Sequence, residues 1–228
     1  MKIVGLIQAR LGSTRLPNKM LLSLHGHPII EWVLRRVEKS KKLDDIIVAI
    51  PDSSQNDLLE KYILNYNHKV FRGSEKDVLS RFYGASQQVD ATHIVRICAD
   101  NPLIDPDEID NLIEFYKSHP CDYAYNHIPR GNKYPDGLGA EIISRELLKF
   151  LYENAVEVKH REHCFSYITD HAGKFNIKTF DPGQPVLWHP ELKFDLDTFQ
   201  DLEYLHENVY DIQVSGEVLV NLYQGSKK

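Results

Sequence analysis

Three positively charged side chains, Arg10, Arg15 and Lys19, lie within ten residues of one another near the N-terminus. Gly12 and Ser13 stand between them and predict a turn that brings backbone N–H groups close to a ligand. Cations that flank such a turn suit a polyphosphate, because the side chains match its charge while the main chain wraps around it. The loop matches neither the G-x-G-x-x-G dinucleotide motif nor the Walker motif. A solvated basic turn is the alternative interpretation.

The position of this loop favours the ligand-binding interpretation. Residues 3–7 form a branched apolar run that predicts a buried strand ending at Gln8, and open α/β sheets bind ligands at the carboxyl ends of their strands. A second apolar run, residues 93–98, predicts a central strand that leads directly to Asp100. Asp100 should therefore face the same crevice and is a candidate ligand for Mg²⁺, which triphosphate chemistry requires. A helix cap is the weaker alternative for Asp100, because Asp105 already caps the next helix.

Two more carboxylates near the C-terminus have the spacing of one strand face. Residues 192–197 alternate in polarity and predict a half-buried strand with Lys193, Asp195 and Asp197 pointing outward. Neighbouring carboxylates repel each other, so a cation beside them is expected. Asp195 and Asp197 are therefore further candidate metal ligands, with an ordinary surface strand as the alternative. Thr198 predicts the N-cap of a helix with an acidic residue at N3.

The elements that must position these residues alternate along the chain. Strands are expected over residues 3–7, 45–50, 69–71, 93–98, 122–126, 140–144, 175–180 and 192–197. Helices are expected over residues 28–39, 57–65, 107–118, 145–154, 158–171 and 215–224, and also after caps at Ser74 and Thr198, with a lysine tail at the C-terminus. The order β-α-β-α-β-α-β-α-β predicts a three-layer α/β domain with a mostly parallel central sheet.

The alternation is interrupted at residues 127–139, which are rich in turn formers and polar groups. A loop of this length in a compact domain is usually functional, so a role in ligand recognition is expected here, with an ordinary hairpin as the alternative. The chain of 228 residues is expected to form a single domain, either simple or with an insertion.

Composition excludes several classes of protein. The formal net charge of −6 argues against a protein that coats nucleic acid, although it leaves room for a local basic pocket. The three cysteines lack C-x-x-C spacing and indicate a reducing compartment without a disulfide framework. The first apolar run is too short for a signal peptide, and no run approaches membrane-spanning length. A cytoplasmic protein that binds neither nucleic acid nor membrane is therefore expected.

The segment Gln8–Lys19 resembles the signature loop of the cytidylyltransferases that activate acidic sugars. This family includes the CMP-sialic acid and CMP-Kdo synthetases, and the chain looks closest to its spore coat polysaccharide branch, the SpsF-like proteins. The resemblance covers nearly the whole chain and implies a Rossmann-like, nucleotide-diphospho-sugar transferase fold. Arg96–Leu103 resembles the family's A-D-x-P-L segment, whose Asp binds metal. Leu192–Leu202 resembles its [IL]-D-x-D-T-x-x-D-[LF] segment, whose Asp pair completes the Mg²⁺ site.

The same resemblance implies which residues meet the substrates. The implied nucleotide contacts are Gln8, Ala9, Arg10, Gly12, Ser13, Arg15, Lys19, Arg72, Gly73 and Ala99. Arg81 is either a further nucleotide contact or a helix-surface ion pair. The implied acceptor contacts, from segments similar to Y-P-D-G-x-x-x-E and R-E-H, are Tyr134, Asp136, Glu141, Arg161 and His163. A helix surface or dimer contact is the alternative for the last two.

These observations predict a magnesium-dependent nucleotidyltransferase. An acceptor oxygen attacks the α-phosphate of CTP and pyrophosphate leaves, with Arg10, Lys19, Asp100 and Asp197 as catalytic residues and Asp100, Asp195 and Asp197 as metal ligands. The resemblance alone implies CTP, an acceptor that is a sugar acid or a sugar or polyol phosphate, a role in surface polysaccharide synthesis, and a homodimer formed through an inserted region at about residues 127–171. A glycosyltransferase of the same superfold and a non-catalytic nucleotide-binding module are the alternatives. The basic loop argues against the former and the three carboxylates against the latter.

Overall fold

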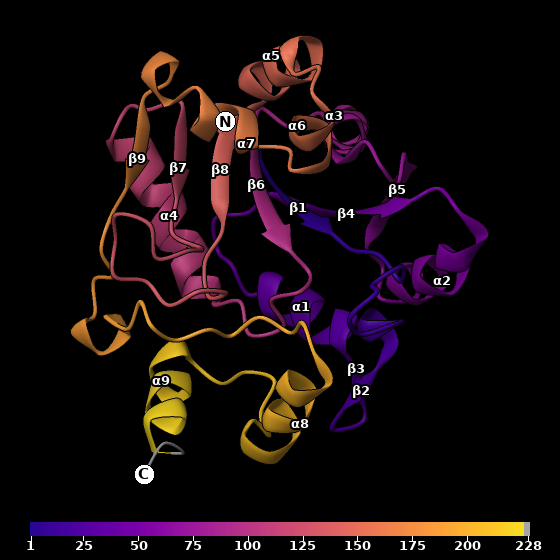
Figure 1. The fold of residues 1–228 in the computed structure, drawn as a ribbon, viewed down its shortest axis with the longest axis vertical. Helices are drawn as coiled ribbons and strands as arrows, with labels where there is room; N and C mark the ends of the chain where they lie inside the picture. Colours follow the sequence, from indigo (N-terminus) through magenta and orange to yellow (C-terminus); the bar gives the residue numbers. More distant parts are fainter. Residues whose placement is uncertain (226–228) are drawn as a thin grey trace.

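The computed structural model describes residues 1–225 as layers of helices around a twisted seven-stranded sheet (Figure 1). The strand order is β5-β4-β1-β6-β8-β7-β9, and among these seven strands of the described residues β8 alone runs antiparallel to its neighbours. The strands are Ile3–Gln8 (β1), Asp45–Pro51 (β4), Lys69–Gly73 (β5), His93–Cys98 (β6), Tyr123–Tyr125 (β7), Glu141–Ser144 (β8) and Ile177–Thr179 (β9), with a separate pair at Ser23–Leu24 (β2) and His27–Pro28 (β3). The predicted α/β class with a mostly parallel sheet is confirmed.

Helices cover both faces of this sheet. The α-helices are Ile29–Val37 (α1), Asp57–Asn65 (α2), Val78–Gln88 (α3), Pro106–Ser118 (α4), Arg145–Asn154 (α5), Val158–Glu162 (α6), Ser166–Asp170 (α7), Phe199–Asn208 (α8) and Gly216–Gly225 (α9). Short 3-10 helices lie at Lys19–Leu21, Ser54–Asn56, Ala172–Lys174 and Pro185–Leu187. One apolar cluster packs α1, α2 and α4 against one face and extends to α8 and α9, and a second packs α3, α5 and α7 against the other. Within residues 1–225, no helix combines the length and the apolar character that crossing a membrane requires.

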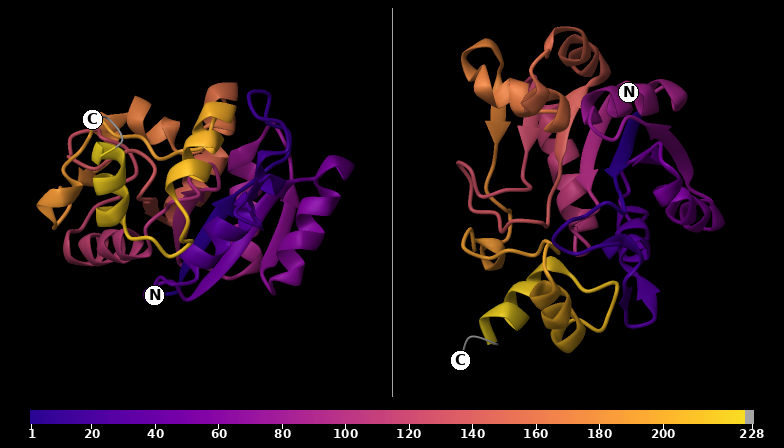
Figure 2. Two further views of the ribbon diagram at one scale, coloured as in Figure 1. Left: turned by 90° about the horizontal axis from the view of Figure 1, so that it is seen from below. Right: turned by 45° about the vertical axis from the view of Figure 1, so that its right-hand side comes forward.

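Both faces of the central strands are buried, which explains their unbroken apolar sequence. In β1, Ile3 and Ile7 belong to one cluster while Val4 and Leu6 belong to the other. The register places Gln8 of β1 level with Cys98 of β6, so the segments that follow these two strands leave the sheet side by side. Figures 1 and 2 show α8 and α9 at the end of the sheet toward which β6 points.

Two predicted helix caps are present and one prediction was wrong. Asp105 accepts a hydrogen bond from the backbone N–H of Asp107 at the start of α4, and Thr198 forms a capping box with Asp201 at the start of α8. Ser74 does not cap α3. Asp77 does so instead, by accepting from the N–H of Ser80, while the Ser74 hydroxyl accepts from the N–H of Asp77.

Two predicted elements also differ in the structure. Residues 158–171 form two short helices rather than one, because the chain turns between them to bury Cys164 and Phe165 in the core. Residues 192–197 are not a strand: only Lys193 forms a bridge, with Asp136. The predicted alternation is nevertheless present, since Leu192, Phe194 and Leu196 are buried. The predicted lysine tail, Lys227 and Lys228, lies outside the described residues.

Candidate active site

The loop after β1 is held in shape at both ends. The backbone N–H of Leu11 donates to Asn56 Oδ1 at 3.0 Å, and the Leu11 carbonyl accepts from the N–H groups of Ser13 (2.9 Å) and Asn18 (3.2 Å). The Ser13 hydroxyl accepts from the N–H of Leu16 at 3.3 Å. Gly12 closely approaches the segment between β5 and α3, because a Cβ there would lie 3.2 Å from Glu75 Oε1. The loop is therefore a defined turn that presents its cations to the end of the sheet.

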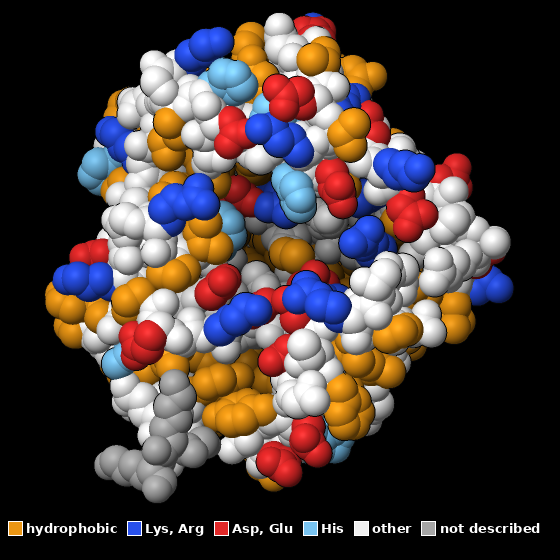
Figure 3. All heavy atoms as spheres, viewed as in Figure 1, with side chains coloured by type: hydrophobic (Ala, Val, Ile, Leu, Met, Phe, Trp, Pro, Cys, Tyr) orange, Lys and Arg blue, Asp and Glu red, His pale blue; other side chains and the backbone are white. Residues whose placement is uncertain are grey.

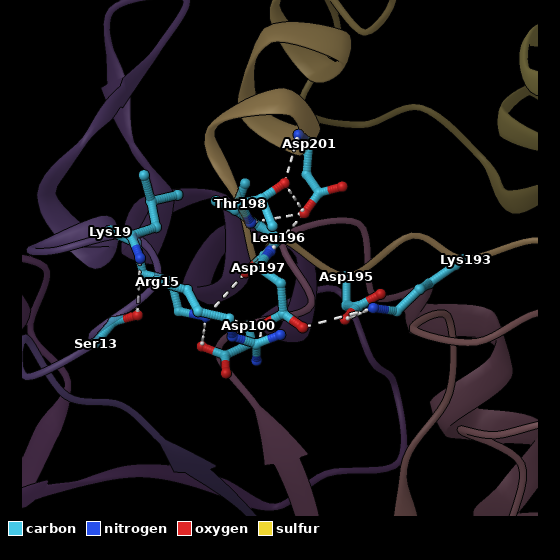
Figure 4. Close-up of polar contacts among 11 residues, drawn as sticks. Ser13, Arg15, Lys19, Asp100, Lys193, Asp195, Leu196, Asp197, Thr198 and Asp201 are labelled. Atoms are coloured by element: carbon cyan, nitrogen blue, oxygen red, sulfur yellow. Dashed lines mark hydrogen bonds and ion pairs between the residues drawn. The ribbon is translucent and has the colours of Figure 1, made fainter.

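Lys19 joins this loop to both acidic segments (Figure 4). Its Nζ lies 2.8 Å from Asp100 Oδ1, 2.9 Å from the Leu196 carbonyl oxygen and 3.5 Å from Asp197 Oδ1. The side chain is only 6% exposed. The N–H of Leu196 also donates to the carbonyl of Asp100 at 2.7 Å. The predicted meeting of Lys19, Asp100 and Asp197 at one end of the sheet is thus present.

Asp197 is surrounded by cations. Its Oδ1 lies 2.9 Å from Arg15 as well as 3.5 Å from Lys19, and its Oδ2 lies 3.5 Å from Lys193. Burial alone would raise the pKa of Asp197, but Lys19, neighbouring Asp195, Arg15 and Lys193 together hold that pKa below its usual value. Asp197 is therefore an ionised carboxylate, and Figure 4 shows it between the loop and the Lys193–Asp195 pair.

Asp195 and Asp136 are half-buried acids beside this centre. Burial raises the pKa of Asp195 even though Lys193 Nζ lies 2.8 Å from its Oδ2. Burial, and then the charge of Asp195, raises the pKa of Asp136 to about 6. Gly137 permits this approach: it has a φ of 93°, and a Cβ there would lie 3.1 Å from the Asp195 nitrogen. The structure thus places predicted acceptor residue Asp136 next to a predicted metal ligand.

The donor chemistry of this cluster fits a divalent cation. Asp100, Asp195 and Asp197 supply hard carboxylate oxygens, and Asp195 Oδ1 is buried without a hydrogen-bond partner among residues 1–225. Within the described part of the chain, no three His, Cys, Asp or Glu side chains form a group that could hold a metal ion by themselves. Mg²⁺ commonly binds one or two carboxylates together with phosphate oxygens, so such a site would be completed by a bound triphosphate.

The other predicted nucleotide contacts have varied surroundings. Gln8, Ala9 and Ala99 lie at the ends of β1 and β6, with the Ala99 N–H donating to the Gln8 carbonyl at 3.0 Å. Arg10 is exposed and forms no ion pair within residues 1–225. Arg72, in contrast, lies 2.8 Å from Asp57 and 2.7 Å from Glu60, so its charge is already compensated.

Gly73 and Arg81 lie next to each other at the start of α3. A Cβ on Gly73 would come within 3.1 Å of the Arg81 side chain. Arg81 itself is buried, and its guanidinium donates to the Ser74 carbonyl. Arg81 is therefore not a helix-surface residue.

The predicted acceptor contacts do not all reach one place. The Tyr134 side chain is fully buried, and its hydroxyl donates to the carboxylate of Glu108 rather than to one of the candidate metal ligands. Arg161 lies 2.5 Å from Asp77 Oδ2 and donates to the Tyr152 carbonyl, which ties α6 to the start of α3 and the end of α5. Only His163 and Glu141 line a common cavity.

That cavity has a volume of about 300 Å³ and lies between β6, β8 and the turn joining α6 to α7. Arg96 pairs with Glu141 on its floor, and Glu141 also accepts from the Tyr123 hydroxyl. Burial would raise the pKa of Glu141, but Arg96 holds it below its usual value. Arg130 stands at the cavity without an ion pair among residues 1–225. Arg96 also donates to Gln8 Oε1 at 3.3 Å, which connects the cavity to the end of β1.

The space-filling view shows these features on one face of the molecule (Figure 3). A hollow near its centre is bordered by Lys and Arg, Asp and Glu, and His side chains, in clear contrast to the apolar patches farther away. An anionic substrate and a metal ion would both find complementary charge in such a hollow.

A comparison with family models agrees with this geometry. The model of the cytidylyltransferases matches residues 4–225. The chain belongs to the cytidylyltransferase family. It is therefore an enzyme of the CTP-dependent nucleotidyltransferase class, and the match spans every residue of the site described above.

Individual members of the family extend this result. The chain is 31% identical over 206 residues to the spore coat polysaccharide biosynthesis protein SpsF of Bacillus subtilis, which covers 88% of this chain and 83% of that protein. It is 34% identical over 123 residues to a 3-deoxy-manno-octulosonate cytidylyltransferase of Bdellovibrio bacteriovorus, covering 53% of this chain and 48% of that one. A solved cytidylyltransferase from Leptospira borgpetersenii superimposes with a TM-score of 0.88 at 28% identity, covering 100% of this chain and 94% of the other. The predicted family and fold are confirmed.

Sequence reasoning expected a cation beside the carboxylates of this cytidylyltransferase site but did not identify Lys19 as the residue that pairs with Asp100 and Asp197. It treated Lys19 as a phosphate contact only, and it overlooked Arg96, His127 and Arg130 at the cavity. One signal was available: Arg96 is a lone arginine in a mostly apolar central strand, and a charge in such a position requires a partner.

Proposed function

We propose that the chain transfers CMP from CTP to a sugar-type acceptor and releases pyrophosphate. The observation that carries this proposal is the convergence of the basic loop after β1 with Asp100 and Asp197, through the contacts of Arg15 and Lys19. A nucleotidyl transfer requires compensation of phosphate charge and fixed carboxylates in one crevice, and both are present. The relatives contribute the identity of the nucleotide, because their family is named for cytidylyl transfer.

The residues would act mainly through position and charge. Arg10, Arg15 and Lys19 would neutralise the phosphates, while the backbone of Gly12 and Ser13 would contact them. Asp100, Asp195 and Asp197 would hold Mg²⁺, which would compensate charge on the α-phosphate as the acceptor oxygen attacks in line. The chain needs no nucleophile of its own, because the acceptor supplies the attacking oxygen.

The cavity beside Arg96 and Glu141 is the proposed acceptor site. It adjoins the nucleotide loop through the contact between Arg96 and Gln8, and Arg130 and His163 add positive or ionisable groups at its edge. These features support an acceptor with both hydroxyl and anionic groups, either a sugar acid or a sugar or polyol phosphate. The product would serve surface polysaccharide or glycoconjugate synthesis, as the name of the SpsF relative suggests for that protein.

A homodimer is also part of the proposal. Phe150, Tyr152, Val156 and Val158 are large apolar residues exposed on and beside α5 and α6, within the region expected to form the contact. The proposed location is the cytoplasm, since the three cysteines are all free, as is usual in a reducing compartment.

The first test is a thermal-shift panel of CTP, UTP, GTP and ATP, each with and without Mg²⁺. A ligand that binds only the native state stabilises it by about 2.7 kcal/mol at a hundredfold excess over Kd. CTP should give the largest shift, and Mg²⁺ should increase it. Pyrophosphate release would then be assayed with a panel of sugar acids and sugar phosphates. A shift with a nucleotide-sugar but with no triphosphate would refute the proposal and favour glycosyl transfer.

A further inference from the structure

The hydrogen-bonding capacity of Lys19 is already filled. An ammonium group has three N–H donors, and three acceptors surround Nζ: Asp100 Oδ1, the Leu196 carbonyl and Asp197 Oδ1. With only 6% of the side chain exposed, little of it faces solvent. In this state Lys19 has no donor left for a phosphate.

The same ammonium lies between the two carboxylates that would bind metal. Asp100 Oδ1 and Asp197 Oδ1 both face Nζ, at 2.8 and 3.5 Å. Lys193 occupies the other oxygen of Asp197 at 3.5 Å, and Arg15 shares Oδ1 at 2.9 Å. A divalent cation that arrives alone must therefore displace at least one positively charged side chain.

We propose that Lys19 is a positioning residue that stands in for the metal ion and makes metal binding depend on the nucleotide. In the free enzyme Lys19 links the segments that carry Asp100 and Asp197, whose carboxylates would otherwise repel each other. When the triphosphate binds, its charge draws Lys19 and Arg15 away from Asp197, and the released carboxylates accept the metal. Metal and triphosphate therefore bind together, rather than the metal first. This inference rests on the proposed function only in taking Asp100 and Asp197 as metal ligands.

The test uses Mn²⁺ alone, without nucleotide, so that chelation of the ion by CTP cannot interfere. Free Mn²⁺ is measured by electron paramagnetic resonance during titration of the wild-type protein, Lys19→Met and Lys19→Arg. We expect weak Mn²⁺ binding by the wild type. Lys19→Met should bind Mn²⁺ at least about tenfold more tightly, because Asp100 and Asp197 lose the charge that bridges them. Lys19→Arg keeps a bridging charge and should bind Mn²⁺ weakly.

Two further variants make the result specific. Lys69→Met removes a lysine that pairs with Asp45 on the neighbouring strand β4, so it controls for the loss of one charge and should bind Mn²⁺ as the wild type does. The double variant Lys19→Met, Asp100→Asn should lose the increase in Mn²⁺ affinity expected of Lys19→Met, because one of the two carboxylates is then gone. Circular dichroism checks that each variant is folded, and Lys19→Gln replaces Lys19→Met if the latter is not.

The outcomes separate this inference from the proposed function. Two results overturn the role given to Lys19. One is equal Mn²⁺ affinity in the wild type and Lys19→Met, and the other is tight binding of Mn²⁺ by the wild type in the absence of nucleotide. The absence of any thermal shift with CTP overturns the proposed nucleotide but leaves the Mn²⁺ comparison valid. If CTP produces a thermal shift but Lys19→Met binds Mn²⁺ no more tightly than the wild type, the proposed function is supported and the inference about Lys19 is overturned.

Discussion

Two ionic clusters lie on either side of the end of β6, and they are built differently. In the cavity cluster, Arg96 pairs with Glu141, which is 4% exposed and also accepts from Tyr123. In the carboxylate cluster, the partners come from a loop and two separate segments, and they include Arg15 at 65% and Asp100 at 40% exposure. The first cluster joins adjacent strands of one sheet, whereas the second joins segments far apart in the sequence.

This difference indicates different tasks. A buried ion pair between strands is costly to break, because loss of one partner leaves a charge without compensation. Asp197 shares its charge among several partners, and two of them, Arg15 and Lys193, are exposed side chains that can exchange it for a ligand at much lower cost. We therefore expect the cavity cluster to maintain the shape of the site and the carboxylate cluster to change partners when substrates bind.

The largest expected effect would come from breaking the cavity cluster. Glu141→Gln leaves the partly buried Arg96 guanidinium without its counter-charge. Removal of one partner of a buried pair typically costs about 3–5 kcal/mol, and the partial exposure of Arg96 places the expected loss toward the lower end of that range. Urea unfolding would measure this loss. The double variant Arg96→Met, Glu141→Leu should recover much of it, because neither charge then remains. A loss below about 1 kcal/mol in Glu141→Gln would show that the two clusters do not differ as described.

In the carboxylate cluster the main effect should be on catalysis. Asp100→Asn should lower kcat/KM for pyrophosphate release by about 100-fold or more, since a preorganised charge at the reacting phosphate is lost. Its stability should change little, because Lys19 keeps Asp197 and the Leu196 carbonyl as partners. Asp90→Asn is a matched control, since Asp90 pairs with Arg145 in an exposed position. Near-normal activity of Asp100→Asn would contradict its assignment as a metal ligand.

The fold was largely predictable because apolar runs and caps are local signals. The run at residues 3–7 has to be buried on both faces, and Asp105 and Thr198 cap their helices through their own side chains. The same kind of signal gave a wrong prediction at residues 192–197, where a strand was expected and none is present. Alternating burial does not make a strand unless a neighbouring strand supplies hydrogen bonds, and here the chain crosses the end of the sheet instead.

The site was predictable where it depends on the ends of strands. Arg15, Lys19 and Asp100 were expected to converge because they follow β1 and β6, and the register brings those two ends together. Motifs did not reveal how individual side chains turn. Tyr134 faces Glu108 in the core, and Arg72 faces helix α2, because the nearest buried acceptor or carboxylate determines the direction of such a side chain.

A smaller, pH-dependent effect should distinguish the acids beside the carboxylate cluster. Burial and Asp195 raise the pKa of Asp136 from its ordinary 3.8 to about 6. The protonated form is thus favoured by folding, so its contribution to stability is complete below pH 3.8 and is lost as the pH rises to about 6. Asp136→Asn should therefore match the wild type near pH 4 and become more stable than the wild type above pH 6. Thermal unfolding at several pH values would measure this, and a constant difference at every pH would contradict it.

The smallest effect concerns the helix that holds the carboxylate cluster in place. Asp201 Oδ2 accepts from the N–H groups of Asp197 (2.9 Å) and Thr198 (2.7 Å), while the Thr198 hydroxyl accepts from the N–H of Asp201 (3.3 Å). Thr198→Ala removes half of this capping box and should cost about 1 kcal/mol of stability, whereas Thr198→Ser should cost much less. Because the same box fixes the backbone of Asp197, Thr198→Ala should also reduce the thermal shift produced by CTP with Mg²⁺. An unchanged shift with lowered stability would mean that contacts with Lys19 and Arg15, rather than the helix cap, position Asp197.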